Sequence, residues 1–489
     1  MVKTDLDQVS AEAAEQALGE QSREPNKISA ATKYSFTGRN LTAYGGLLPV
    51  TAMLEKLEFR ELVGTSVNLE LKRMPRAMNP SDFLLAMILA VYVGFSRLNH
   101  LQYLEREPML LGILRVARLP VQSTFWRFLA SLHLSVERQL GSLNARLRER
   151  VWAAANVRLT VVTLDTDTTV HTLYGDQMGG RVSYNRKNKG KPSYQPMLTF
   201  IAETREYAGG GLHNGDKPSG ESIARHLARV IEALPKTVET LRARADSGFY
   251  CWDAVKAYTE LKCDFVIVAR KTDRLLGELQ AADWRSSPQT DADFECQFSY
   301  QPEGWEREYR FVGLRYDQPE PDANNPDQIG LFDGLACRYR VFVTSIGSSE
   351  KWGPAEVVAF YNKRAAVENL IKESNNDIGL TAHPSGQWAM NANHFQLRMI
   401  AYNLNCWLEL FERDESITVP ELTHRTVATT RLRLVYLAAK ITRHGGQTEI
   451  HFGSQYQERG RFDQLMARLR SIERKMDGFI AVVNTPLRA

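Results

Sequence analysis

Residues 159–169 read Leu-Thr-Val-Val-Thr-Leu-Asp-Thr-Asp-Thr-Thr, an apolar strand-forming run that ends in two aspartates. A second run follows the same pattern, because Thr-Leu-Arg-Ala-Arg-Ala at 240–245 leads directly into Asp246. A strand that stops at a carboxylate places that group at the rim of a sheet, where the core holds it and solvent reaches it. The two runs therefore predict a sheet edge at which carboxylates gather.

Strands at 195–203 and 263–269 and helices at 220–234 and 252–261 surround these runs. The order predicts an α/β fold with a mixed sheet, built from short hairpin links first and helical crossovers later. We divide the chain into a flexible N-terminal arm (1–30), a helical DNA-binding region (31–155), the first part of the core (156–273), a β-rich insertion (274–337), the second part of the core (338–413) and a basic helical C-terminal region (414–489).

Composition places the chain among ordinary soluble proteins, with 489 residues that are 43% hydrophobic and 24% charged. The sequence contains no apolar stretch of the roughly 18 residues that a membrane span needs, and acidic residues near the N-terminus argue against a signal peptide. The five cysteines show no CxxC spacing, which argues against zinc and disulfide frameworks and fits a cytoplasmic location. The net charge of +4 is small, so a polyanion would be met by local basic patches.

Three acidic positions form the candidate catalytic set. Asp165 and Asp167 have the same parity on a strand and point to one face, so either can supply the first carboxylate, and Asp167 is preferred. Asp246 supplies the second. Glu368 lies on a predicted helix over 359–372, where it shares a face with Tyr361, Arg364 and Lys372; a surface ladder of ion pairs is the alternative interpretation. Two strand-end aspartates and a helix glutamate predict a site for two Mg²⁺ ions, for which Mn²⁺ can substitute.

The order of these motifs resembles the DDE transposases of bacterial insertion sequences, and more narrowly the 1380-type branch of the group-four superfamily. The motifs are Leu-Asp-x-Asp-x-Thr at 164–169 with Tyr-Gly at 174–175, Arg-x-Asp-Ser-Gly-Phe at 244–249, and Tyr-x-x-Arg-x-x-x-Glu-Asn at 361–369. The resemblance covers about residues 80–475. It departs at Asn375, seven residues after the glutamate, where the superfamily signature often has a lysine; Lys372 is a candidate substitute.

The resemblance implies a ribonuclease-H-like core, a β insertion between the second aspartate and the glutamate, and Mg²⁺-dependent cutting and joining of transposon ends. It implies that Asp167, Asp246 and Glu368 are the catalytic and metal-binding residues, and that Tyr361 and Arg364 act on the DNA beside them. In related enzymes a tryptophan of the insertion can hold a flipped base, and Trp305, in a predicted exposed turn, is the candidate here.

Basic segments supply the remaining DNA-binding candidates. Residues 180–191 carry five cations and no acid close to the carboxylate rim, and they read as a DNA-tracking loop or as a solvated hairpin. The segment 120–129 indicates a helix-turn-helix-like unit or a plain helical bundle. The predicted DNA-binding residues are Arg127, Arg181, Arg186, Lys187, Lys189, Tyr361, Arg364 and Lys372.

The sequence thus favours a DNA transposase that binds terminal inverted repeats and acts by cut and paste as a homodimer on double-stranded DNA, in the bacterial cytoplasm at the nucleoid and without membrane contact. A transposase-derived repressor without catalytic activity and a non-specific ribonuclease-H-like nuclease remain as alternatives.

Overall fold

A computed structural model describes residues 28–69, 78–183, 185, 188–317, 337–414 and 416–473. The chain divides into two compact units, Met1–Asn40 and Leu41–Ala489. The described part of the first unit, residues 28–40, is exposed and forms no helix or strand. The predicted flexible arm lies mostly outside the described residues. The elements below all belong to the second unit.

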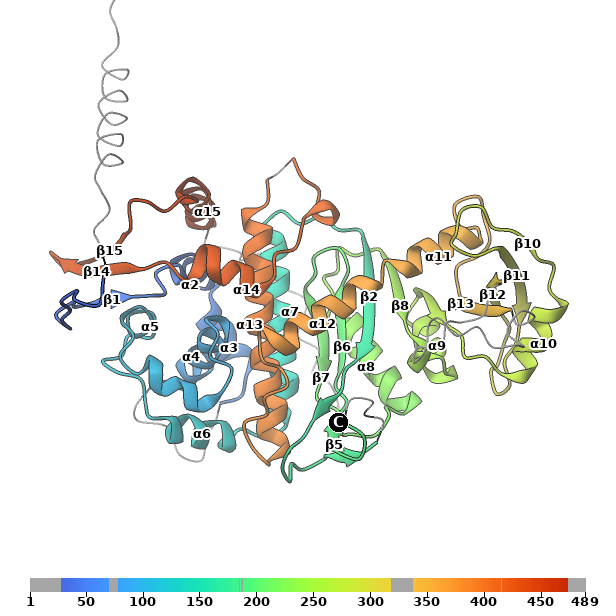
Figure 1. Cartoon of the computed structure of the whole chain (residues 1–489), viewed down its shortest axis with the longest axis horizontal. Coiled ribbons are helices and arrows are strands. Elements are labelled where there is room, and N and C mark those ends of the chain that lie inside the picture. The colour runs from blue at the N-terminus through green and yellow to red at the C-terminus, as the bar shows by residue number, and fades with distance from the viewer. Residues whose placement is uncertain are drawn as a thin grey trace, which may run out of the picture. The chain divides into compact units, whose positions relative to one another are not determined.

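Helices occupy the N-terminal part of the second unit (Figure 1). The longest of them, α7, ends just before the first long strand, and residues 70–77 lie outside the described ranges. These helices are α2 (Leu47–Lys56), α3 (Phe59–Ser66), α4 (Pro80–Tyr92), α5 (Pro108–Leu114), α6 (Gln122–Ser131) and α7 (Ser135–Ala154). Helix α4 has apolar residues all round and is buried from Asp82 to Tyr92, as expected for a core helix.

A nine-stranded mixed sheet follows, in the order β10-β11-β12-β13-β9-β8-β2-β6-β7. The strands that come first in the chain are antiparallel neighbours, since β6 pairs antiparallel with both β2 and β7. The next strands are parallel, since β8 pairs in parallel with β2 and with β9. The strands are β2 (Val161–Thr168), β6 (Met197–Ile201), β7 (Tyr207–Gly211), β8 (Thr240–Ala245) and β9 (Cys263–Val268).

The segment predicted as a separate β-rich insertion extends this same sheet. Strand β13 (Arg338–Thr344) pairs antiparallel with β9, and β12 and β11 continue outward from it. The outer elements are α10 (Asp273–Ala281), β10 (Arg285–Ser286), β11 (Phe294–Tyr300) and β12 (Tyr309–Tyr316). The insertion is therefore held to the core by backbone hydrogen bonds of a shared sheet.

Two smaller sheets account for the rest of the β structure of the described residues. One lies directly after β2 and has the order β3-β5-β4, from β3 (His171–Thr172), β4 (Arg181–Val182) and β5 (Pro192–Tyr194). The other joins β1 (Leu41–Thr42) to the hairpin of β14 (Ala439–His444) and β15 (Gln447–Phe452). The remaining helices are α8 (Gly220–Glu232), α9 (Trp252–Glu260), α11 (Pro354–Asn362), α12 (Ala365–Asn376), α13 (Trp388–Glu412), α14 (Val427–Thr430) and α15 (Arg459–Ser471).

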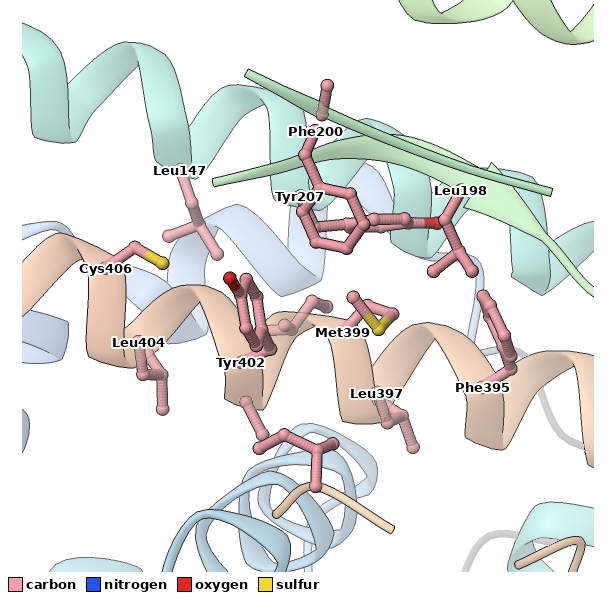
Figure 2. Packing of buried hydrophobic residues seen from close by; sticks show 14 of the residues in the cluster. Leu147, Leu198, Phe200, Tyr207, Phe395, Leu397, Met399, Tyr402, Leu404 and Cys406 are labelled. Atoms are coloured by element: carbon pink, nitrogen blue, oxygen red, sulfur yellow. The ribbon is translucent and has the colours of Figure 1, made fainter. Parts of the chain in front are cut away.

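Helix α13 joins the helical region to the sheet. It is buried from Met390 to Phe411 and packs against α4 and α7 and against β7. Figure 2 shows Tyr402 and Met399 of α13 facing Phe200 and Tyr207 of β6 and β7, and the Phe200 and Tyr402 rings lie 5.7 Å apart. Despite its length, α13 is not apolar enough to cross a membrane, and neither is any other helix of the described residues.

A buried carboxylate fixes this junction. Glu206, in the turn between β6 and β7, is fully buried and accepts hydrogen bonds from Arg148 Nε at 3.1 Å and Trp152 Nε1 at 2.7 Å, both on α7. It also accepts one from Trp407 Nε1 of α13 at 2.9 Å. Because a buried charge is tolerated only when it is paired and hydrogen-bonded, these donors tie both helices to the sheet turn.

Candidate active site

The ends of β2 and β8 lie side by side. The parallel register pairs Asp165 with Arg244 and ends at the pair Thr166–Ala245, so Asp167 and Asp246 directly follow the last pair, and Asp246 acts electrostatically on Asp167. Neighbouring strands are about 4.8 Å apart. Residues two apart on a strand share a face, so these four side chains belong to one face of the sheet at one edge.

Helices α11 and α12 cover that face (Figure 1). Arg244 Nη1 donates to the Phe360 carbonyl of α11 at 2.8 Å, and Arg364, at the start of α12, forms an ion pair with Asp167. The single helix predicted over 359–372 is wrong, because α11 ends at Asn362 and α12 begins at Ala365. At this break the Arg364 amide bonds the Tyr361 carbonyl at 2.8 Å, a three-residue spacing that tightens the chain.

Asp165 has a structural partner. Arg244 donates to both of its oxygens, from Nε at 2.6 Å and from Nη2 at 2.7 Å, and both residues are buried. Burial raises the pKa of the Asp165 carboxyl, and the Arg244 hydrogen bonds oppose that shift. One guanidinium thus holds both oxygens of Asp165, whereas the oxygens of Asp167 have two different partners, the Thr168 amide at 2.7 Å and Arg364 Nη2 at 2.6 Å.

The electrostatic surroundings of Asp167 raise the pKa of its carboxyl. Burial raises the pKa of its carboxyl to about 6; Arg364, whose Nη2 lies 2.6 Å from Oδ2, opposes the shift, and Asp246 adds to it. A neighbouring carboxylate raises the pKa of Asp167 in this way, because its charge disfavours a second negative charge at the site. A cation placed between the two carboxylates relieves the repulsion, so the pair fits a divalent ion with oxygen ligands.

The turn after β8 holds Asp246 in place. Its Oδ1 accepts from the Gly248 amide at 2.9 Å, and a Cβ on Gly248 would lie only 2.8 Å from that oxygen. Arg270 stabilises the same turn, because its Nε donates to the Ser247 carbonyl at 2.9 Å and its Nη2 donates to the Gly248 carbonyl at 3.3 Å. A side chain at position 248 would therefore force the Asp246 carboxylate to shift.

Glu368 lies on α12 between two contacts with β2. Arg364, four residues before it, reaches Asp167, while Asn375, seven residues after it, donates to Thr169 Oγ1 at 3.1 Å. Residues at these spacings share one stripe of a helix, so Glu368 belongs to the stripe that faces the end of β2. Its side chain is exposed.

The structure does not bring the three predicted ligands together as one group. Across the described ranges, no set of three or more His, Cys, Asp or Glu side chains is close enough to hold a metal ion. It brings together Asp167 and Asp246, with Arg364 against them, and leaves Glu368 on the adjacent helix stripe. The two adjoining aspartates supply the oxygen donors that a divalent ion prefers.

Tyr361 is buried at the same edge. Its ring packs 4.9 Å from the Phe342 ring, with the Arg340 guanidinium 5.3 Å from its centroid. Burial raises the pKa of Tyr361, Arg364 lowers it and Asp246 raises it further, so the hydroxyl lies within electrostatic range of the cluster. It remains a protonated hydrogen-bond donor at neutral pH.

The other predicted DNA-binding residues lie on the surface where they are described. Arg127 is exposed on α6, where its Nη2 donates to Thr124 Oγ1 of the same helix at 3.3 Å. Arg181 of β4 is exposed and 3.9 Å from Asp216, and Lys189 and Lys372 are exposed. Arg186 and Lys187 lie outside the described residues.

Trp305 does not lie in an exposed turn, and that prediction is wrong. Only 8% of the residue is exposed. Its ring packs 5.2 Å from Tyr250, 5.9 Å from Trp252 and 5.7 Å from Tyr309. The insertion tryptophan is part of the core that joins the insertion to the turn after Asp246.

Sequence reasoning gave no structural role to four residues that shape the site. Arg244 could have been found from its spacing, since it lies two residues before Asp246 and so shares its face. Arg270 and the pair His171–Asn375 had no signal in the sequence, because their partners are distant in the chain.

The comparisons with known proteins place the chain in a family. The family model described as "Transposase DDE domain group 1" matches residues 25–474, so the chain belongs to this family of DDE transposases. None of the curated proteins compared with the chain matches it. Among solved structures, the cryo-EM structure of a piggyBac transposase synaptic complex with hairpin DNA is similar at 11% identity and a TM-score of 0.38, over 73% of this chain and 74% of that one. The expected transposase family is confirmed by the family match alone.

Proposed function

We propose that this transposase binds the terminal inverted repeats of a bacterial insertion sequence of the 1380-type branch and moves it by cut-and-paste strand cleavage and strand transfer. Asp167, Asp246 and Glu368 are proposed to hold two Mg²⁺ ions. The single observation that carries the proposal is the register of β2 and β8, which sets Asp167 beside Asp246 on the face that α12 covers with Glu368.

The order β7-β6-β2-β8-β9 supports the proposal that this part of the sheet is a ribonuclease-H-like core. Its three antiparallel strands come first and its parallel strands follow, as expected for that fold from hairpin links and later crossovers. The carboxylates then lie at the end of the central strand β2 and its parallel neighbour β8.

The residues of the chain have separate tasks in this mechanism. Bound divalent ions would activate the attacking oxygen and stabilise the leaving oxygen of the phosphodiester. Arg364 Nε is buried and has no hydrogen-bond partner among the described residues, so it is available to a phosphate oxygen beside Asp167. The exposed cations Arg127, Arg181, Lys189 and Lys372 are proposed to contact the DNA backbone.

The test is cleavage of a duplex that spans the boundary of the element encoding this chain, beside a scrambled duplex of the same length. We expect Mg²⁺-dependent cutting of the boundary duplex alone, lost in Asp246→Ala and kept in Asp283→Ala, whose side chain is 88% exposed. Binding without cutting would indicate a DNA-binding repressor. Equal cutting of both duplexes would indicate a non-specific nuclease.

A further inference from the structure

The end of α12 is joined to the end of β2 by a short chain of hydrogen bonds. Asn375 Nδ2 donates to Thr169 Oγ1 at 3.1 Å, and Asn375 Oδ1 lies 3.0 Å from His171 Nε2. His171 Nδ1 lies 3.2 Å from His383 Nε2, in the segment between α12 and α13. We call this set of four residues the latch.

Only one assignment of hydrogen-bond donors and acceptors is consistent with these contacts. A carboxamide oxygen accepts, so His171 donates from Nε2 to Asn375. His171 is fully buried and burial lowers its pKa to about 4, so the ring is neutral and has one N–H. Its Nδ1 must therefore accept from His383 Nε2, and every hydrogen bond of the latch is between neutral groups.

The latch acts at the position of the candidate ligands. Thr169 lies two residues after Asp167, and its own amide is tied to the Pro196 carbonyl at 3.1 Å. Asn375 lies seven residues after Glu368, about 10.5 Å along the helix and about 20° short of two full turns. Arg364 contacts Asp167 at the other end of the same stripe. The helix face that carries Glu368 is thus pinned to β2 on both sides of the glutamate.

We propose that Asn375 is a positioning residue, which through the latch fixes the helix face that carries Glu368 against the chain that follows Asp167. The proposal rests on the proposed function above. Asn375 bonds the chain after β2 as a neutral amide, through Nδ2 to Thr169 Oγ1. Outer partners that orient metal ligands typically contribute about 10–100-fold to metal affinity or activity.

The experiment compares Asn375→Ala with its exposed neighbour changed in the same way, Asn376→Ala. Binding of Mn²⁺ is measured from the EPR signal of the free ion, and cleavage of the boundary duplex is followed against Mg²⁺ concentration. We expect Asn375→Ala to weaken Mn²⁺ binding and to raise the Mg²⁺ concentration for half-maximal cleavage, each by about 10-fold. Asn376→Ala should match the wild-type chain in both.

A double-mutant comparison separates positioning from general structural damage. If Asn375 acts through Glu368, Asn375→Ala adds no further loss of Mn²⁺ affinity in a Glu368→Gln background. Thr169→Val keeps the shape of the side chain and removes only the hydroxyl acceptor, so it should show the same direction of effect even if Asn375→Ala folds poorly.

Two results would overturn the inference. Wild-type Mn²⁺ affinity in both Asn375→Ala and Thr169→Val would do so, as would a loss in Asn375→Ala that adds fully to that of Glu368→Gln. A wild-type chain that binds no Mn²⁺ and cuts no duplex would instead refute the proposed function itself.

Discussion

Exchanging Asp165 and Asp167 separately for asparagine distinguishes a carboxylate that holds the fold from one that serves the reaction. The two lie two residues apart on β2 and point to the same face, but they have different partners. Asp165 is bonded through both oxygens to the buried Arg244. Asp167 faces Arg364 and the second carboxylate, Asp246.

Asp165→Asn leaves the Arg244 guanidinium buried without its counter-charge. Breaking a buried ion pair by removing one partner costs about 3–5 kcal/mol of the free energy of unfolding. Arg244 also holds the Phe360 carbonyl at 2.8 Å, so its displacement would loosen α11 as well. We expect a destabilised protein that keeps some activity under conditions in which it is folded.

Asp167→Asn is expected to change stability less than Asp165→Asn, because Arg364 contacts one oxygen of Asp167 whereas Arg244 bonds both oxygens of Asp165. The pKa of Asp167 is raised from 3.8 to about 6, so ionisation costs the folded state free energy at every pH above 6, and that cost vanishes below 3.8. The difference, at 1.36 kcal/mol per pH unit, corresponds to about 3 kcal/mol as an upper limit. Asp167→Asn also removes the counter-charge of the buried Arg364, which offsets this gain, so we expect a variant about as stable as the wild-type chain, yet inactive.

Urea unfolding at pH 7.5, followed by tryptophan fluorescence, compares the midpoints of both variants with the wild-type chain, and Mg²⁺-dependent cleavage of the boundary duplex compares activity. The reasoning is refuted if Asp165→Asn keeps wild-type stability but loses all cleavage while Asp167→Asn still cuts. That outcome would make Asp165 the metal ligand.

Three further perturbations follow from buried contacts of the described chain. Burial disfavours charge on His424, but its hydrogen bonds to Glu373 and Glu409 prevail and raise its pKa to about 9. The free energy of unfolding should therefore be highest below pH 6.5 and fall by about 3 kcal/mol as pH rises through 9. His424→Gln should abolish that pH dependence of the urea midpoint. Trp305→Ala should cost about 3–5 kcal/mol in the same measurement and leave the affinity for duplex DNA, by fluorescence anisotropy, unchanged; a large loss of affinity with normal stability would contradict its core role. Glu206→Gln should lower the urea midpoint by an amount equivalent to about 3–5 kcal/mol, because Arg148 loses its buried counter-charge, and a wild-type midpoint would argue against that pairing.

The position of the strand-end carboxylates could be predicted from the sequence because the pattern that indicates it is local. An apolar run with period two that stops at an aspartate specifies both the strand and the end of the sheet at which the side chain lies. The hairpin links before Asp246 and the helical crossover after it are local features too, and the mixed sheet follows from them.

Contacts between distant segments had no such signal. The ion pair of Asp165 with Arg244 depends on strand register, which is set by the packing of the whole sheet. The break after Asn362 was missed because the periodic pattern of apolar residues runs on through it. Trp305 was placed in an exposed turn because its neighbours in the chain are polar, whereas its partners are aromatic rings about 50 residues earlier and on β12.

Glu368 combines a feature that the sequence predicts with one that it does not. Its helix and its stripe were readable from the spacing of its neighbours, but its distance from the aspartates depends on the break before α12 and on the Asn375 contact after it. Neither is encoded in the residues next to the glutamate.

The most direct measurement is a crystal structure of the protein with Mn²⁺ and a duplex end, in which the anomalous signal locates the ions. The account predicts two ions about 3.5–4 Å apart, ligated by Asp167, Asp246 and Glu368, with Asp165 still bonded to Arg244. Ions bound elsewhere, or a Glu368 side chain that turns away from both aspartates with DNA in place, would contradict it.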